Sequence, residues 1–349
     1  MSPTNNAAKN ANLHSAKKEK NDEFYTQLGD IENELKHYTP HFSGKTVYCN
    51  CDDPTVSGFV RYFFNNFRRL GLQRLIATCY KNQGIDLFTD NTAEQSCWFD
   101  YQPTMEKRAN DEKPDLRSLR AKKFRKDGDF RSKECIDLLQ EADIVCTNPP
   151  FSLFREYVAQ LMEYNKKFII IGNKNAITYK EIFPLIKEDK MWCGYTPMGV
   201  DMLFDVPEEV AQQFITNKKE GSSYRIINGV VKGRSQSIWF TNLDTAKRHV
   251  ELTLYKTYNV EEYPKYDNYD AIEVSKVVEI PKDYDGAMGV PLTFFDKYNP
   301  NQFEIIGMSA SAGYNREIVG LEKVSTIKDA RPLINNKNTY ARIFICKRQ

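Results

Sequence analysis

Short apolar runs and a helical pattern alternate along the first part of the chain. Residues 45–50 (KTVYCN) and 73–80 (QRLIATCY) predict strands, and an aromatic-rich helical pattern between them ends at Gly71. A strand, a helix and a second strand in this order indicate a β-α-β unit with parallel strands.

Polar residues and prolines predict where these elements begin and end. Apolar positions 31 and 35 favour a helix over 30–38 that ends at Thr39-Pro40. Pro54 suits the first position of the aromatic-rich helix, which makes Asp53 its predicted N-cap.

The alternation returns after residue 130. Helices are expected at 135–140 and 154–164, and strands at 143–147 and 167–172. Both strands are continuous apolar runs, typical of a parallel sheet that is covered on both faces. Residues 81–126 interrupt the rhythm and are expected to form a basic insertion or a long surface loop.

Beyond about residue 190 the pattern becomes rich in short strands, predicted at 226–231, 237–240, 249–255, 303–307 and 340–347. We therefore expect an α/β fold with a Rossmann-like sheet and a smaller, β-rich C-terminal domain. The expected divisions are a flexible arm at 1–20, a catalytic domain at 21–190, and a recognition region at 191–349 whose end can return to the core sheet.

Composition limits the classes of function. The chain has 349 residues, and 49 Lys and Arg against 47 Asp and Glu give a formal net charge of +2. This balance excludes a polycation, so any nucleic-acid surface must be local. No apolar run approaches the roughly 20 residues of a membrane-spanning helix. Scattered cysteines favour reduced thiols without zinc, and we expect a soluble cytoplasmic protein.

The tetrapeptide 148–151 (NPPF) carries the clearest chemistry. It follows the strand predicted at 143–147, at the end where open parallel sheets bind ligands. Two prolines leave a backbone that offers only carbonyls, and Asn148 adds a neutral acceptor. Convergent acceptors suit a planar NH2 group, on which Phe151 can stack. The predicted catalytic residues are Asn148, Pro149, Pro150 and Phe151; the alternative is a plain loop after a strand.

A conjugated amine is a weak nucleophile because its lone pair is delocalised. Acceptors on both of its hydrogens favour a more pyramidal nitrogen and direct the lone pair toward an electrophile. The natural electrophile is the sulfonium methyl group of S-adenosylmethionine, and the chemistry requires no metal.

Five segments together resemble the EcoRI methylase family of DNA adenine-N6 methyltransferases. The similarity spans about residues 20–345, in an order similar to the gamma arrangement of such enzymes. The segments are 21–26 (NDEFYT), 47–54 (VYCNCDDP), 127–131 (DGDFR), 143–152 (DIVCTNPPFS) and 289–300 (GVPLTFFDKYNP). The resemblance implies a methyltransferase sheet that binds S-adenosylmethionine, but it assigns no role to 289–300.

The resemblance also implies a set of cofactor-binding residues, which are Phe24, Tyr25, Thr26, Asn50, Asp52, Asp129 and Phe130. Core packing explains Phe24 and Tyr25 equally well, and a turn is the alternative for Asp129. The usual glycine-rich turn is replaced by 51–54 (CDDP), and the second strand does not end in the usual ribose-binding carboxylate. Asp52, Asp53 and Asp86 are the candidates to replace it.

Duplex DNA is the expected partner, with the target adenine extruded from the stack. Phosphate contacts need local basic residues. The predicted DNA-binding residues are Arg117, Arg120, Lys122, Lys123, Arg125, Lys126, Lys232 and Arg234. A solvated helix face is the alternative for 117–126, and a polar turn for 232–236.

We therefore expect a monomeric, site-specific DNA adenine-N6 methyltransferase. The alternatives are methylation of RNA adenine or of a protein glutamine amide, and a non-catalytic DNA-binding relative.

Overall fold

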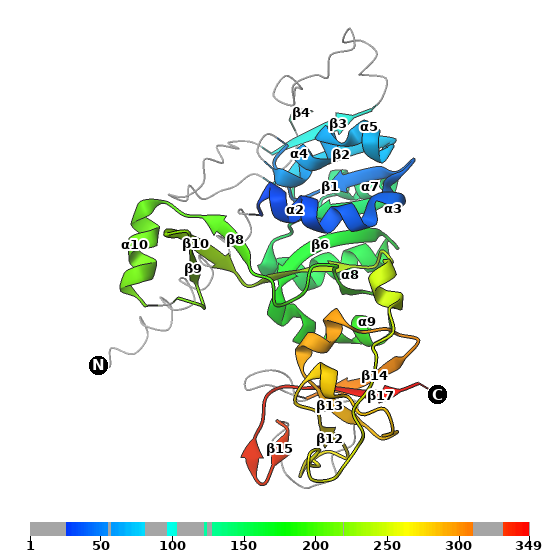
Figure 1. Ribbon diagram of the computed structural model, residues 1–349. Helices are drawn as coiled ribbons and strands as arrows, with labels where there is room; N and C mark the ends of the chain where they lie inside the picture. Colours follow the sequence, from blue (N-terminus) through cyan, green and yellow to red (C-terminus); the bar gives the residue numbers. More distant parts are fainter. Residues whose placement is uncertain are drawn as a thin grey trace, which may run out of the picture. The chain divides into compact units, whose positions relative to one another are not determined.

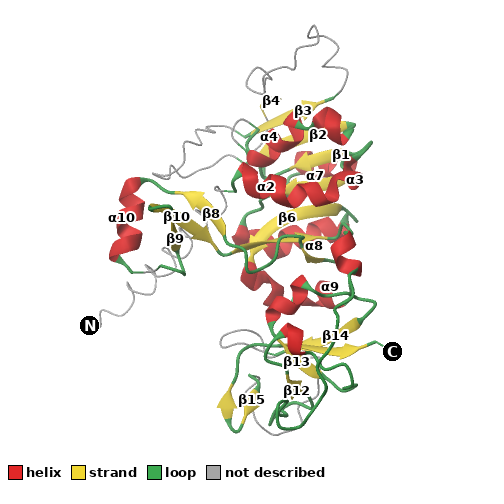
Figure 2. Cartoon of the chain, in the orientation of Figure 1, coloured by secondary structure: helices red, strands yellow, loops and turns green. Residues whose placement is uncertain are grey.

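The computed structural model describes residues 26–54, 57–80, 96–102, 122–123, 128–218, 220–309 and 331–348. The chain divides into two compact units, residues 1–174 with 200–243 and residues 175–199 with 244–349. Figure 1 traces both units along the sequence, and Figure 2 separates their helices from their strands.

A mixed sheet forms the centre of the first unit. Its strands lie in the order β4 (Lys122–Lys123), β3 (Cys97–Tyr101), β2 (Arg74–Cys79), β1 (Thr46–Cys49), β5 (Ile144–Thr147), β6 (Lys167–Asn173) and β11 (Ser237–Thr241). The four strands from β2 to β6 run parallel, whereas β3, β4 and β11 are antiparallel to their neighbours. This sheet confirms a mixed α/β fold with a large parallel part.

Strand order fixes where the helices lie. The chain passes from β1 to β2 through α4 (Gly58–Asn65) and α5 (Phe67–Leu70), and in the opposite direction from β5 to β6 through α8 (Phe154–Glu163). Because such crossovers are right-handed, α4 and α8 cover opposite faces of the sheet. Ligands of such sheets bind where the strand order reverses, here at the carboxyl ends of β1 and β5. We call these two strand ends the site edge.

Three further helices belong to the first unit. α2 (Leu28–Leu35) packs against α4, α3 (Thr39–Phe42) packs against α5, and α7 (Lys133–Glu141) packs against β1. α2 lies close to α4 at Gly58, where a Cβ atom would lie 2.8 Å from Cδ1 of Ile31 and 3.3 Å from the carbonyl oxygen of Thr26. This contact brings the segment that precedes α2 to the start of α4.

Two predicted helix boundaries are wrong. The N-cap of α4 is Ser57, whose Oγ accepts the backbone N–H groups of Phe59 and Val60, so Asp53 does not cap it. The turn after β1 is therefore longer than the sequence indicated. Pro40 lies in the first turn of α3, which begins at Thr39, and does not end a helix, since proline fits a first helical turn. Gly71, with φ of 65°, ends α5 as expected.

A second, small sheet in the first unit consists of β8 (Met202–Asp205), β10 (Val230–Ser235) and β9 (Tyr224–Ile227), in that order, with α10 (Glu208–Thr216) between β8 and β9 in sequence. The single strand predicted at 226–231 is instead divided between β9 and β10, because Asn228 and Gly229 form a hairpin turn within it. Asn228 and Gly229 have φ of 50° and 80°, and positive φ at both central residues is typical of the turn that Asn-Gly favours.

The second unit contains a sheet in the order β12 (Ile272–Glu273), β13 (Met288–Val290), β17 (Ile343–Lys347) and β14 (Phe303–Met308). It also contains α9 (Phe183–Lys187), β7 (Trp192–Cys193), and the pair β15 (Leu333–Ile334) and β16 (Lys337–Asn338). The strand predicted at 249–255 is wrong. There the backbone of Leu252 exchanges hydrogen bonds with the side chain of Gln302 instead of with a neighbouring strand.

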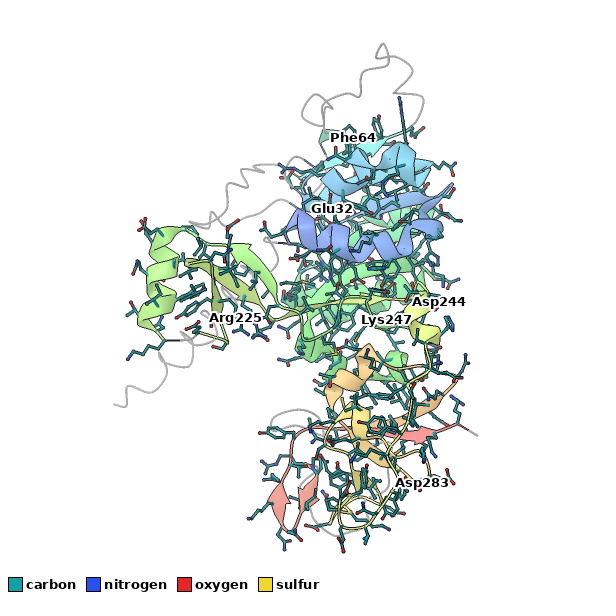
Figure 3. All side chains as sticks on the ribbon, viewed as in Figure 1. Glu32, Phe64, Arg225, Asp244, Lys247 and Asp283 are labelled. Atoms are coloured by element: carbon teal, nitrogen blue, oxygen red, sulfur yellow. The ribbon has the colours of Figure 1, made fainter. Side chains whose placement is uncertain are left out.

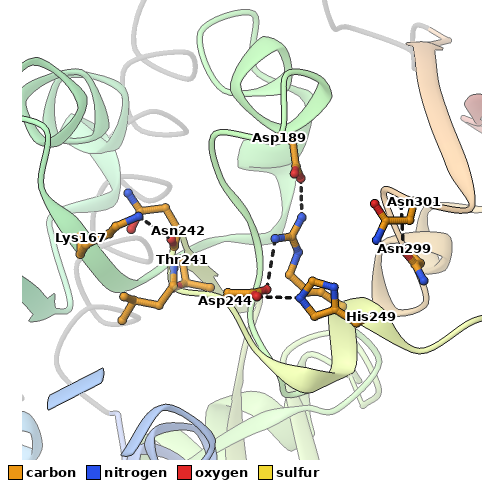
Figure 4. A network of polar contacts seen from close by, with 10 residues as sticks. Lys167, Asp189, Thr241, Asn242, Asp244, His249, Asn299 and Asn301 are labelled. Atoms are coloured by element: carbon orange, nitrogen blue, oxygen red, sulfur yellow. Dashed lines mark hydrogen bonds and ion pairs between the residues drawn. The ribbon is translucent and has the colours of Figure 1, made fainter. Parts of the chain in front are cut away.

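Polar networks order the loops of the second unit. Arg248 donates to Asp189 and Asp244, and Nε2 of His249 lies 2.6 Å from Oδ2 of Asp244 (Figure 4). The Arg248 guanidinium also stacks on Trp192, 3.5 Å from the ring centre. These contacts fasten the segment after residue 244 to the segment around α9. In neither unit is any described helix long and apolar enough to cross a membrane.

Candidate active site

Asp52 ties together the turns that follow β1 and β5. It is 8% exposed, and its Oδ1 accepts the hydroxyl of Ser57 at 2.6 Å. Its Oδ2 accepts the hydroxyl of Thr147, the last residue of β5, and its carboxylate also accepts the backbone N–H of Asn148. The same Thr147 oxygen accepts the backbone N–H of Cys51 at 3.2 Å. The two turns at the site edge are therefore one hydrogen-bonded assembly.

The charge of Asp52 is unusual because the groups that donate hydrogen bonds to it, from Ser57, Thr147 and Asn148, are neutral. Burial raises the pKa of Asp52 from 3.8 to about 6, and the hydrogen bonds from Ser57, Thr147 and Asn148 oppose that rise. A carboxylate with this pKa is ionised near neutral pH and becomes protonated in mild acid. The site edge thus carries a buried negative charge at pH 7.

Asn50 presents a hydrogen-bond donor at the end of β1. Its Oδ1 accepts the hydroxyl of Tyr157 from α8, and its backbone carbonyl accepts the hydroxyl of Thr78 at 3.1 Å. Within the described residues, its Nδ2 is buried and has no hydrogen-bond partner. A buried amide N–H group of this kind costs free energy unless a ligand accepts from it.

The tetrapeptide 148–151 lies directly beside these groups. Asn148 is buried, and its Nδ2 donates to Oγ1 of Thr26 at 3.4 Å. The carbonyl of Pro150 accepts the backbone N–H of Leu153 at 3.0 Å, so it already has a partner in the turn that leads into α8. Pro149 and Phe151 are also buried. The structure thus brings Thr26, Asn50, Asp52 and Asn148 to the site edge.

The loop 128–130 lies against the end of β2. Gly128 has φ of 75°, and a Cβ atom there would lie 2.4 Å from the carbonyl oxygen of Cys79, so only glycine allows this approach. Asp129 accepts both the backbone N–H and the guanidinium of Arg131, which lower the pKa of its carboxyl. Phe130 is buried, with its ring centre 5.1 Å from that of Tyr157 in an edge-on contact.

The predicted DNA-binding residues are less well defined. Lys232 forms an ion pair with Asp205, and Arg234 forms one with Asp201. Lys122 and Lys123 form β4, but their side chains lie outside the described set. The remaining predicted residues, Phe24, Tyr25, Arg117, Arg120, Arg125 and Lys126, lie outside the described residues, as does Asp86. Among those that are described, no group of three or more His, Cys, Asp or Glu is arranged to hold a metal ion.

Sequence reasoning missed the residues that hold the site together. Tyr157 and Thr147 contact the predicted residues Asn50 and Asp52, and Ser57 both caps α4 and donates to Asp52. Thr147 had a visible signal, as a hydroxyl that ends an apolar strand. Tyr157 gave no such signal in the sequence, because its position on α8 is one that an ordinary core residue would occupy.

A strand-order reversal with paired polar turns is consistent with an α/β methyltransferase fold, and the comparisons with known proteins agree. The family model described as adenine-specific methyltransferase EcoRI matches residues 12–348. Type II methyltransferase M.EcoRI of Escherichia coli is 50% identical over 302 residues, covering 86% of this chain and 89% of the relative. No solved structure is a significant match.

Two relatives from mycoplasmas match almost end to end. Type II methyltransferase M.MpnI of Mycoplasma pneumoniae is 37% identical over 97% of this chain and 98% of its own length. Type II methyltransferase M.MgeORF184P of Mycoplasma genitalium is 36% identical over 97% of this chain and 99% of its own length. The chain belongs to the EcoRI family of adenine-specific methyltransferases. It is an enzyme that methylates adenine in DNA at specific sites.

Proposed function

We propose that the enzyme transfers the methyl group of S-adenosylmethionine to the N6 amine of an adenine extruded from duplex DNA. The observation that carries this proposal is the convergence of Thr26, Asn50, Asp52 and Asn148 where the strand order of the sheet reverses. An uncharged amide beside a proline turn suits a neutral, planar NH2 group.

The residues after β1 fit the cofactor. The buried Nδ2 of Asn50 offers a donor, and Asp52 supplies a negative charge at the edge that would face a cofactor carrying a sulfonium and an amino group. We propose that Thr26 and the loop at Asp129 and Phe130 complete this site. When bound, S-adenosylmethionine supplies an electrophilic methyl group. Asp52 and Asp53 remain candidates for the ribose hydroxyls.

We propose that the protein positions the amine and holds its two hydrogens with polar acceptors. The side-chain oxygen of Asn148 accepts one N6 hydrogen, and a backbone carbonyl accepts the second. Since the Pro150 carbonyl already accepts from Leu153, the carbonyl of Pro149 is the one we assign. With both hydrogens held, the nitrogen lone pair points away from the two acceptors. Phe151 is proposed to pack against the base.

The context of the enzyme follows from its relatives and its substrate. The relatives are named Type II methyltransferases, so we propose that this enzyme serves as the modification partner of a restriction system. We propose that the enzyme acts as a monomer. Since its substrate is DNA, we expect it to act in the cytoplasm.

The test measures transfer of a tritiated methyl group from S-adenosylmethionine to duplex DNA, RNA and protein by the purified chain. Only duplex DNA should gain label, at the N6 position of adenine. Asn148→Ala should lower turnover by roughly 100- to 1,000-fold, the size of loss seen when one group that stabilises a transition state is removed. Its affinity for S-adenosylmethionine, measured by calorimetry, should stay within about twofold of that of wild type, because the other residues proposed to bind the cofactor are unchanged.

A matched control is Asn33→Ala, which truncates an exposed asparagine of α2 that accepts a hydrogen bond from Lys36. This variant should keep full activity. If Asn148→Ala also keeps full activity, the assignment of the tetrapeptide is wrong. Label on RNA or on a glutamine amide at a comparable rate would contradict the proposed substrate.

A further inference from the structure

The tip of the β9–β10 hairpin, residues 226–231, exposes a cluster of apolar side chains. Ile226, Ile227 and Val230 are 47%, 44% and 54% exposed, and no residue between 226 and 231 is charged. In a strand with one buried face, apolar residues alternate with polar ones. At this tip both faces are apolar, because Ile226 pairs with Val231 on one face and Ile227 with Val230 on the other.

The base of the hairpin is well packed and carries charged side chains, unlike the tip. On one face Gly233 lies against Phe204, where a Cβ atom would come within 2.4 Å of the ring, and Tyr224 stacks on Phe214 of α10. On the other face, Asp201 forms ion pairs with Arg225 and Arg234 (Figure 3 labels Arg225). The apolar tip is therefore carried on a well-packed support.

The strand register connects this hairpin to the site edge. β10 ends at Ser235, and the chain enters β11 at Ser237, which pairs with Asn173 at the carboxyl end of β6. The backbone N–H of Lys174 also donates to the carbonyl of Gln236 at 2.7 Å. The carboxyl ends of β6 and β5 lie at the same edge because these strands are parallel. The small sheet thus leaves the main sheet at the edge that holds Asn148.

We propose that the hairpin tip is a wedge that inserts apolar side chains into the base stack of the DNA beside the target adenine. This inference rests on the proposed function, since it assigns a role in extruding the base. The major groove admits a two-stranded ribbon, and proteins that unstack DNA use aliphatic wedges of this kind. Because the ion pairs engage the basic residues at its base, the hairpin contributes apolar contact and not phosphate attraction.

The occupant that the structure favours is DNA and not a second copy of the chain. The proposed function places the DNA at the edge from which the base of the hairpin departs, so the hairpin that carries the tip is continuous with the proposed substrate-binding region. Removing a base from the stack exposes apolar base faces and leaves a gap, and side chains without charge can fill it.

The test uses a double variant, Ile227→Ser with Val230→Ser, which keeps the Asn-Gly turn and removes the apolar character of one face of the tip. The control is Val260→Ser, at a valine of the second unit that is 70% exposed. The substrate is a duplex with the sequence that wild type methylates, found by sequencing N6-methyladenine. A second duplex is identical except for an abasic site opposite the target adenine, which lowers the cost of extrusion.

On the matched duplex the double variant should lose roughly tenfold or more in kcat/KM, whereas on the abasic duplex it should recover to within about threefold of wild type. Fluorescence of 2-aminopurine at the target position should show less unstacking with the double variant than with wild type. Affinity for S-adenosylmethionine and thermal unfolding should match those of the control.

Each of the remaining outcomes would contradict the wedge or the proposed function. Full activity of the double variant on the matched duplex overturns the wedge. Equal losses on the two duplexes also overturn it, because the tip would then act in binding and not in extrusion. Unchanged activity together with lost self-association would assign the tip to a contact between copies. If the sequencing finds no N6-methyladenine made by wild type, the proposed function itself is contradicted, and the test of the tip is not reached.

Discussion

Asp52 in the first unit and Glu273 in the second are both buried carboxylates, yet their partners differ in charge. Asp52 accepts hydrogen bonds from neutral groups, Ser57, Thr147 and the backbone of Asn148. Glu273 is bound by the guanidinium of Arg342 and also accepts the hydroxyl of Tyr266. Glu273, whose charge is neutralised by Arg342, stabilises the fold. Asp52 accepts from neutral groups, so its protonation can respond to a ligand and to pH.

The largest expected effect concerns the ion pair of the second unit. Arg342→Met should lower the free energy of unfolding by about 3–5 kcal/mol, because it leaves Glu273 buried without its cation. Denaturant unfolding measures this loss. The double variant Glu273→Leu with Arg342→Met should be more stable than Arg342→Met alone. If the single variant loses less than about 1 kcal/mol, a typical value for an exposed pair, Glu273 is not held as described.

Asp52 should make the free energy of unfolding depend on pH. Because its pKa rises from 3.8 in the unfolded chain to about 6 in the folded protein, the folded state retains a proton that the unfolded state releases between these values. Protonation of Asp52 therefore stabilises the fold fully below about pH 4, and this contribution, about 3 kcal/mol, is lost as the pH rises through about 6.

This contribution is isolated by comparing wild type with Asp52→Asn, which cannot titrate at this position. Between pH 4 and pH 7, wild type should lose about 2 kcal/mol of unfolding free energy relative to the variant, measured by urea unfolding at each pH. A difference that stays constant across this range would show that Asp52 keeps an ordinary pKa.

Tyr157→Phe tests whether the orientation of Asn50 matters for the cofactor. The change removes the hydroxyl that donates to Oδ1 of Asn50 and keeps the ring that packs against Phe130. Affinity for S-adenosylmethionine should fall roughly three- to tenfold, the value of one hydrogen bond. Tyr38→Phe is a suitable control, because it removes a buried hydroxyl that donates to Glu34 at 2.8 Å. Equal affinity of wild type and Tyr157→Phe would contradict this role.

The smallest expected effect is that of Lys232→Ala. Its ion pair with Asp205 is solvent-exposed, so the free energy of unfolding should change by less than about 1 kcal/mol. The salt dependence of DNA binding should also stay unchanged, since Lys232 already has an acidic partner. A fall in the salt slope of about one unit would support the phosphate contact that the sequence suggested.

The sequence was sufficient for the parallel strands and for the position of the turn 148–151 directly after β5. Continuous apolar runs located β1, β2, β5 and β6, because strands buried on both faces leave no polar gaps. The long turn after β1 was not predictable, since it depends on Ser57 and Asp52, which meet only in the folded chain. The Asn-Gly turn at 228–229 was visible in the sequence but lies inside an apolar run, which favoured a single strand.

The contacts across the site edge could not be inferred from sequence. Asn50 and Tyr157 are 107 positions apart, and Asn148 and Thr26 are 122 apart. Their proximity results from the strand order and from the handedness of the crossovers, which no local pattern specifies.

The most direct test of the central claim is single-molecule sequencing of DNA from cells that express either wild type or Asn148→Ala, scored for N6-methyladenine. Wild type should methylate adenine in one short recognition sequence, at nearly every copy, and Asn148→Ala should leave the same sequence unmodified. Equal methylation by both proteins, or the absence of a methylated sequence with wild type, would contradict the account.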